Sequence, residues 1–154
     1  MIAETTMKVL IVEDDQFKLN DIMAFFERSH PGFQILVSRS VNSAKKSLLG
    51  ESFDLAVLDM SLPTFDIGVG GGGGDPKNFG GLEIIRYIAR RRINCRFIVI
   101  TQFAAFGEGE DSMDRETLRE ALANDYPALY QGMIYYASDS DWSNKLSFII
   151  GCDD

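Results

Sequence analysis

Short apolar runs alternate with amphipathic segments along most of the chain. The runs are rich in β-branched residues, and continuous apolar runs of this length are typical of strands buried on both faces of a parallel sheet. We therefore predict strands at residues 8–12, 33–37, 55–58, 97–100 and 133–136.

The segments between these runs have the spacing of helices. Apolar residues recur at i, i+3, i+4 and i+7 within residues 19–26, and at i, i+3 and i+7 within residues 41–48. Helical spacing continues at residues 82–89, 118–122 and about 141–150. The fourth of these helices has a candidate N-cap at Ser112. The alternation predicts an α/β fold, (βα)5, in which right-handed crossovers place helices on both faces of a parallel sheet.

Residues 61–80 interrupt this pattern with a run of glycines. So many glycines cost too much backbone entropy to hold regular structure, so we predict a flexible insertion at about residues 64–80. Gly68, Gly70 and Gly73 formally match a dinucleotide-binding fingerprint, but they do not lie between a strand and an immediately following helix. The interpretation as a linker is favoured.

Composition and charge narrow the class of protein. The 154 residues suffice for a single domain over 1–154, and no apolar run approaches the roughly 20 residues that span a bilayer. A formal net charge of −8 argues against a nucleic-acid-binding surface. Two cysteines without disulfide or metal-ligand spacing favour a reduced, cytoplasmic protein. The lack of a long apolar run predicts no membrane insertion.

Acidic residues and a hydroxyl follow the predicted strands. Glu13 and Asp14 follow the first strand, Asp59 the third, and Thr101 the fourth. Because the carboxyl ends of parallel strands meet at one edge of the sheet, these side chains are expected to converge there. Crowded carboxylates favour a hard cation such as Mg²⁺, and an aspartate beside it is a candidate nucleophile for phosphoryl transfer.

The same residues carry a resemblance to a known family. Val-Glu-Asp-Asp at 12–15, Leu-Asp-Met-Ser-Leu-Pro at 58–63 and Ile-Val-Ile-Thr at 98–101 resemble the receiver domains of response regulators. The likeness covers nearly the whole chain and implies a flavodoxin-like, doubly wound sheet of five parallel strands in the order 2-1-3-4-5. It also implies a two-component phosphorelay in which a histidine kinase or phosphotransfer protein donates a phosphoryl group.

The resemblance assigns a role to each residue at the strand ends. Asp59 would accept the phosphoryl group, and Thr101 would hydrogen-bond it. Glu13, Asp14, Asp59 and the backbone carbonyl of Ser61 would bind Mg²⁺ or Mn²⁺.

The resemblance also implies how the signal would leave the domain. Tyr135, or else Tyr136, would change its exposure together with Thr101. A downstream protein would dock on the face formed by the fourth helix and the fifth strand. Because the chain ends soon after the fifth helix, no attached output domain is expected. Self-modification would be the only catalysis, so we do not predict an enzyme.

The sequence departs from the family pattern near the predicted pocket. Receivers normally carry a lysine just beyond the fifth strand, but this position falls at Ser138, or at Ala137 if the register slips by one. A serine brings no positive charge to a phosphoryl group. Gln102 and Phe103 stand where small residues are usual, and their bulk is expected to cover part of the pocket. The connection over residues 103–111 is longer than usual.

Two alternative functions remain at this stage. The missing lysine favours a pseudo-receiver, a protein-interaction module that keeps the fold and signals without phosphorylation. A hydrolase that forms an aspartyl phosphate would need a second acid two residues after the nucleophile, where Ser61 stands.

Overall fold

A computed structural model describes residues 6–66, 76–77, 79–106, 113–137 and 141–151. Its centre is a sheet of five parallel strands in the spatial order β2-β1-β3-β6-β9. The strands are β1 (Lys8–Val12), β2 (Gln34–Ser38), β3 (Leu55–Leu58), β6 (Arg96–Thr101) and β9 (Tyr130–Tyr135). Counted along the chain within this sheet, the order is 2-1-3-4-5, which confirms the predicted doubly wound fold.

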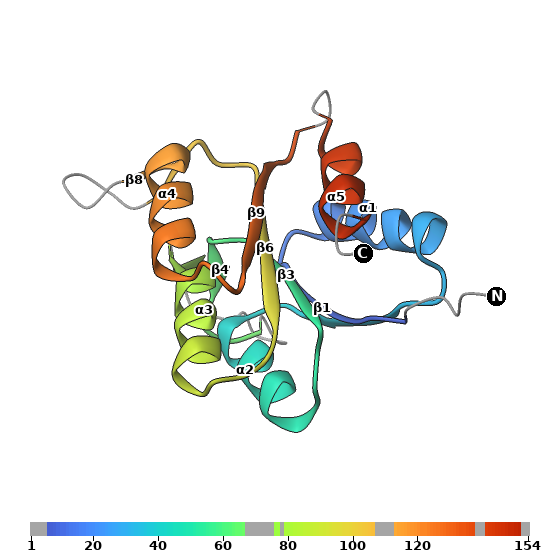
Figure 1. The fold of residues 1–154 in the computed structure, drawn as a ribbon, viewed down its shortest axis with the longest axis horizontal. Coiled ribbons are helices and arrows are strands. Elements are labelled where there is room, and N and C mark those ends of the chain that lie inside the picture. Colours follow the sequence, from blue (N-terminus) through green and yellow to red (C-terminus); the bar gives the residue numbers. More distant parts are fainter. Residues whose placement is uncertain (1–5, 67–75, 78, 107–112, 138–140, 152–154) are drawn as a thin grey trace.

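Helices cover both faces of the sheet (Figure 1). They are α1 (Gln16–Ser29), α2 (Val41–Gly50), α3 (Gly80–Arg90), α4 (Arg115–Asp125) and α5 (Trp142–Gly151). α1 and α5 lie on one face, and α2, α3 and α4 lie on the other. Two apolar cores result, one on each side of the sheet, and alternate residues of β1, β3 and β6 point into each. No helix in the described ranges is long and apolar enough to cross a membrane.

The helix caps explain where α1 and α4 begin. Asp15 Oδ1 accepts hydrogen bonds from the backbone amides of Phe17 and Lys18. Asp15 is therefore the N-cap of α1, a position at which aspartate is strongly preferred. For α4 the N-cap predicted at Ser112 is wrong, because Asp114 holds this position and accepts from Thr117 N at 2.8 Å. Ser112 itself lies outside the described residues.

The edge strand β9 begins three residues earlier than predicted. The apolar run marks only its second half, whereas Tyr130 and Gly132 pair with Phe97 and Ile98 around an irregularity in the register. A strand at the sheet edge is half-exposed, so its first residues need not be apolar, and hydrophobicity alone underestimates its length.

Most of the predicted glycine-rich insertion lies outside the described residues. Its two ends are described: β4 (Leu62–Pro63) and β5 (Pro76–Lys77) form a short antiparallel ladder, and α3 already begins at Gly80. A second short ladder joins β7 (Ala105–Phe106) to β8 (Met113–Asp114). In the long connection after β6, β8 therefore lies beside β7.

Gly81 brings α3 against the strand end that carries Asp59. A Cβ added at Gly81 would lie 2.1 Å from the Asp59 carbonyl oxygen, and Gly81 N donates to Met60 O at 2.9 Å. Neither backbone can move away without displacing β3 or α3.

We therefore expect Gly81→Ala to lower the free energy of unfolding by about 2 kcal/mol or more. The matched control is Gly50→Ala at the end of α2, where an added Cβ meets nothing within 4 Å. Urea denaturation followed by circular dichroism measures both variants. Equal stability of the two variants would contradict the close approach.

Candidate functional site

The predicted acids and the hydroxyl lie at the carboxyl edge of the sheet. Glu13 follows β1, Asp59 follows β3, and Thr101 is the last residue of β6, whose neighbours in the sheet are β3 and β9. Glu13 and Asp59 are each only 2% exposed, and Thr101 is fully buried. Asp14 is half-buried, as is Ser61. The fold therefore brings the predicted residues to one edge, as the topology requires.

A buried lysine lies between two of these acids. Lys18 Nζ is 2.9 Å from Asp59 Oδ2 and 2.7 Å from Glu13 Oε1, and it donates to the carbonyl oxygen of Ile100 at 2.6 Å. The Lys18 side chain has no exposed surface. An ammonium group has three donors, so each hydrogen of Nζ has an acceptor. The three acceptors come from the ends of β1, β3 and β6.

The strand-end motifs do not point to Lys18, but the helix pattern contains a signal. Lys18, Ile22 and Phe25 follow the i, i+4, i+7 spacing of the buried face of α1, whereas the apolar Phe17 is 85% exposed. If only apolar residues are assigned to the buried face of α1, this face begins at Leu19 and the lysine is omitted.

Burial and charge act against each other at Glu13. Desolvation is the largest effect and raises the pKa of Glu13 to about 7, Lys18 opposes it, and the charge of Asp59 adds to it. Partial burial also raises the pKa of Asp14. Glu13 and Asp59 share one ammonium group, so when both acids are ionised the single positive charge of Lys18 balances only one of the two negative charges.

The second oxygen of Asp59 also has a donor. The backbone amide of Met60 donates to Asp59 Oδ1 at 2.7 Å. Gln102 Nε2 lies 3.5 Å from Asp15 Oδ2, so the Gln102 side chain reaches from the end of β6 to the start of α1. Phe103 is exposed, and its amide donates to Thr101 Oγ1 at 3.2 Å.

The described residues contain no group of three or more His, Cys, Asp or Glu side chains arranged to hold a metal ion. The Glu13 carboxylate faces Lys18 Nζ instead. Asp59 Oδ2 is paired with the same ammonium group, so a cation would share Asp59 with Lys18 and take Asp14 and the Ser61 carbonyl as its other predicted ligands. Mg²⁺ commonly uses one or two carboxylates and fills its other positions with water and phosphate oxygens, so this reduced donor set suits it.

The two tyrosines at the end of β9 face opposite sides of the sheet. Tyr135 is 39% exposed, and the Arg115 guanidinium lies 4.0 Å from its ring centroid. The Tyr136 ring lies 5.9 Å from Lys18 Nζ, its hydroxyl donates to Asp21, and its amide donates to Thr101 O at 2.8 Å. Burial and the hydrogen bond to Asp21 raise the pKa of Tyr136. The roles predicted for these tyrosines stay predictions.

Ala137, the alternative position for the family's lysine, is half-buried. Ser138 lies outside the described residues.

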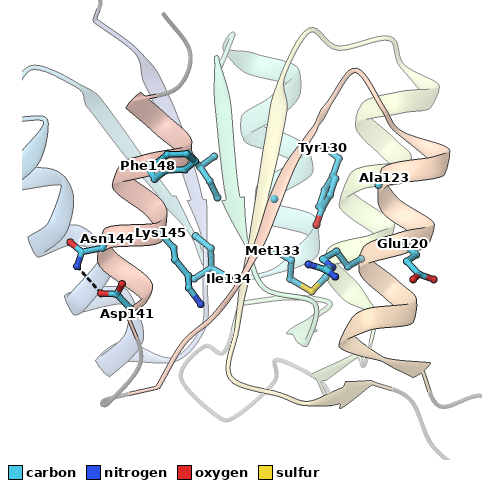
Figure 2. A pocket seen from close by; sticks show the side chains of 12 residues that line it. Glu120, Ala123, Tyr130, Met133, Ile134, Asp141, Asn144, Lys145 and Phe148 are labelled. Atoms are coloured by element: carbon cyan, nitrogen blue, oxygen red, sulfur yellow. Dashed lines mark hydrogen bonds between the residues drawn. The ribbon is translucent and has the colours of Figure 1, made fainter.

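A groove of about 690 Å³ lies on the face formed by α4, β9 and α5. Figure 2 shows Phe148 and Lys145 of α5 on one wall and Ala123 of α4 on the other, with Tyr130 and Met133 of β9 between them. Phe148, a large apolar side chain on one wall of the groove, is 72% exposed. This groove lies on the face predicted to bind a downstream protein.

Comparison with known proteins agrees with this fold. No model of a protein family matches the chain. The Detocs response regulatory protein DtcB of Enterobacter cloacae (strain JD6301) is 26% identical over 143 residues, which cover 91% of this chain and 95% of that protein.

Solved structures show the same likeness. The signal receiver domain of an HD domain-containing protein from Pseudomonas fluorescens Pf-5 is 13% identical with a TM-score of 0.63, covering 96% of this chain and 94% of that one. A DNA-binding response regulator of the LuxR family from Staphylococcus aureus is 20% identical with a TM-score of 0.61, covering 95% of this chain and 97% of that one. The chain therefore has the fold of response-regulator receiver domains.

The raised pKa of Glu13 predicts a pH dependence of stability. A carboxyl group whose pKa is higher in the folded than in the unfolded protein stabilises the fold at pH values below its unfolded pKa. This contribution is lost as the pH rises through its folded pKa. For Glu13 the window runs from 4.5 to about 7.

We expect the unfolding free energy of the wild type to fall relative to that of Glu13→Gln across this window, by up to about 1.4 kcal/mol per pH unit. Denaturant titrations of both proteins at several pH values measure the difference. A difference that stays flat or changes in the opposite direction would mean that Lys18 keeps Glu13 ionised throughout.

Proposed function

We propose that this protein is a phosphorelay receiver that accepts a phosphoryl group on Asp59 from a phosphohistidine of a kinase or phosphotransfer protein. An Asp59 carboxylate oxygen attacks phosphorus, an O–P bond forms, and the P–N bond breaks with its electron pair left on the imidazole nitrogen. The observation that carries this proposal is the Asp59 carboxylate at the strand end, with the Lys18 ammonium group on one oxygen and a backbone amide on the other. Donors held in fixed positions stabilise the negative charge that develops in the transition state of phosphoryl transfer.

A divalent cation belongs to this proposal. Asp14, Asp59 and the backbone carbonyl of Ser61 would hold Mg²⁺ or Mn²⁺, and the cation would neutralise charge on the phosphoryl oxygens. Glu13 would assist from its position beside Lys18 rather than as a direct ligand. Asp14 supports this assignment because it forms no ion pair with a described residue.

The pseudo-receiver remains the second candidate, and one observation favours it. Asp59 is only 2% exposed and already forms an ion pair, so the carboxylate is closed to a phosphoryl donor in this conformation. Acceptance of a phosphoryl group would require the Asp59 carboxylate to become accessible.

The groove between α4 and α5 is our proposed binding surface for the downstream protein. Its apolar lining and the exposed Phe148 support this, as does its continuity with a second hollow that is lined by Tyr135 and Arg115. Phosphorylation would reach the groove through Thr101, whose register partner in the sheet is Tyr135.

Incubation with acetyl phosphate and Mg²⁺ tests the function directly. Transfer to Asp59 releases acetate, and intact-mass spectrometry is expected to show the gain of one phosphoryl group. The adduct should be absent in Asp59→Asn and should not form in the presence of EDTA. Wild-type protein that stays unmodified while folded by circular dichroism would reject the phosphorelay and favour the pseudo-receiver.

Hydrogen exchange tests the proposed output surface. Acetyl phosphate is expected to change the amide exchange of β9 and α4 in the wild type, because Thr101 lies beside Tyr135 in the sheet. The same treatment should leave Asp59→Asn unchanged. Changes confined to α1 and α2 would place the output surface away from the face formed by α4, β9 and α5.

A further inference from the structure

We propose that Lys18 of α1 supplies the positive charge for the phosphoryl group that receivers otherwise obtain from a lysine beyond the fifth strand. This inference rests on the proposed function. Lys18 Nζ already binds the Asp59 carboxylate, and it would exchange that contact for a phosphoryl oxygen when Asp59 is phosphorylated.

The position of Nζ supports this role. The ammonium group is held by the Ile100 carbonyl, one residue before Thr101 at the end of β6. It also lies 5.9 Å from the ring of Tyr136, directly after the end of β9. Nζ therefore lies close to the ends of β3, β6 and β9.

The charges at the site give a reason for a cation here. Glu13, Asp14 and Asp59 are all acids, and Lys18 is the cation paired with Asp59 among the described residues. A phosphoryl donor brings further negative charge, and burial strengthens the repulsion because the effective dielectric constant is low. An ammonium group already held beside the nucleophile lowers this repulsion.

The length of the lysine side chain makes the exchange of partners feasible. Nζ is 2.9 Å from Asp59 Oδ2, so an oxygen of a group attached to that carboxylate comes within reach through rotation of the terminal bonds. The contacts with Glu13 and Ile100 would remain and keep Nζ in place. Lysine acts on phosphate as a point charge, so no fixed plane has to be matched.

The competing explanation is that Lys18 only neutralises two buried acids. A buried ion pair that loses one partner is destabilised by several kcal/mol, so Lys18→Met alone could fail to fold. We therefore compare Glu13→Gln, which keeps Lys18 on Asp59, with the double variant Glu13→Gln/Lys18→Met, which removes one acid together with the lysine. Lys46→Met, at an exposed lysine on α2, controls for the loss of a lysine as such.

The first readout is the rate of adduct formation by intact-mass spectrometry as the acetyl phosphate concentration is varied with Mg²⁺ present. The double variant is expected to have a maximal rate on the order of 100-fold below that of Glu13→Gln, while Lys46→Met matches the wild type. The second readout is binding of beryllofluoride, a phosphoryl mimic. Trp142 fluorescence reports it, because Trp142 packs on Tyr136 with ring centroids 5.5 Å apart. Beryllofluoride should bind more weakly to the double variant.

The outcomes separate this inference from the proposed function. Equal rates and equal beryllofluoride binding in the two Glu13→Gln proteins, both folded by circular dichroism, would overturn the role of Lys18 and leave the phosphorelay intact. Absence of any adduct in the wild type would reject both. A slower double variant with unchanged secondary structure and weaker beryllofluoride binding would establish Lys18 as a phosphoryl-binding residue.

Discussion

The site depends on one buried ammonium group that lies between two carboxylates. Glu13 and Asp59 stand at the ends of adjacent strands and are both removed from water. Two desolvated carboxylates this close would repel each other, and a buried charge without a partner costs several kcal/mol. Lys18 Nζ offsets this cost and joins α1 to the ends of β1, β3 and β6. The site is therefore a point where one helix and three strands are held together.

This arrangement links the chemistry of Asp59 to both layers of helices. On one face, Lys18 lies near the Tyr136 ring, which packs on Trp142 of α5, and Trp142 in turn contacts Phe25 of α1. On the other face, Gly81 sets α3 directly against the Asp59 backbone. A change of charge or bonding at Asp59 would therefore reach α1 and α5 through side-chain contacts and α3 through the backbone.

The sequence predicted the fold well because the sheet is buried on both faces. Buried strands must be continuous apolar runs, so β1 and β3 are found within their observed limits, whereas the edge strand β9 has polar residues that hide its start. The acids at the strand ends follow from the same topology. Lys18 could not be inferred from those motifs, because a lysine is ordinarily solvated and its burial depends on acids that are distant in sequence.

A phosphoryl group responds to where a charge lies in space, and it does not depend on which strand or helix supplies the side chain. A lysine side chain reaches far from its backbone, so a position on the buried face of α1 can serve a point that the end of β9 would otherwise serve. The absence of a lysine at Ser138 therefore does not imply a site without positive charge. Under the proposed function, the charge and the phosphoacceptor would be joined through α1, and a movement of this helix would change the electrostatic potential at Asp59.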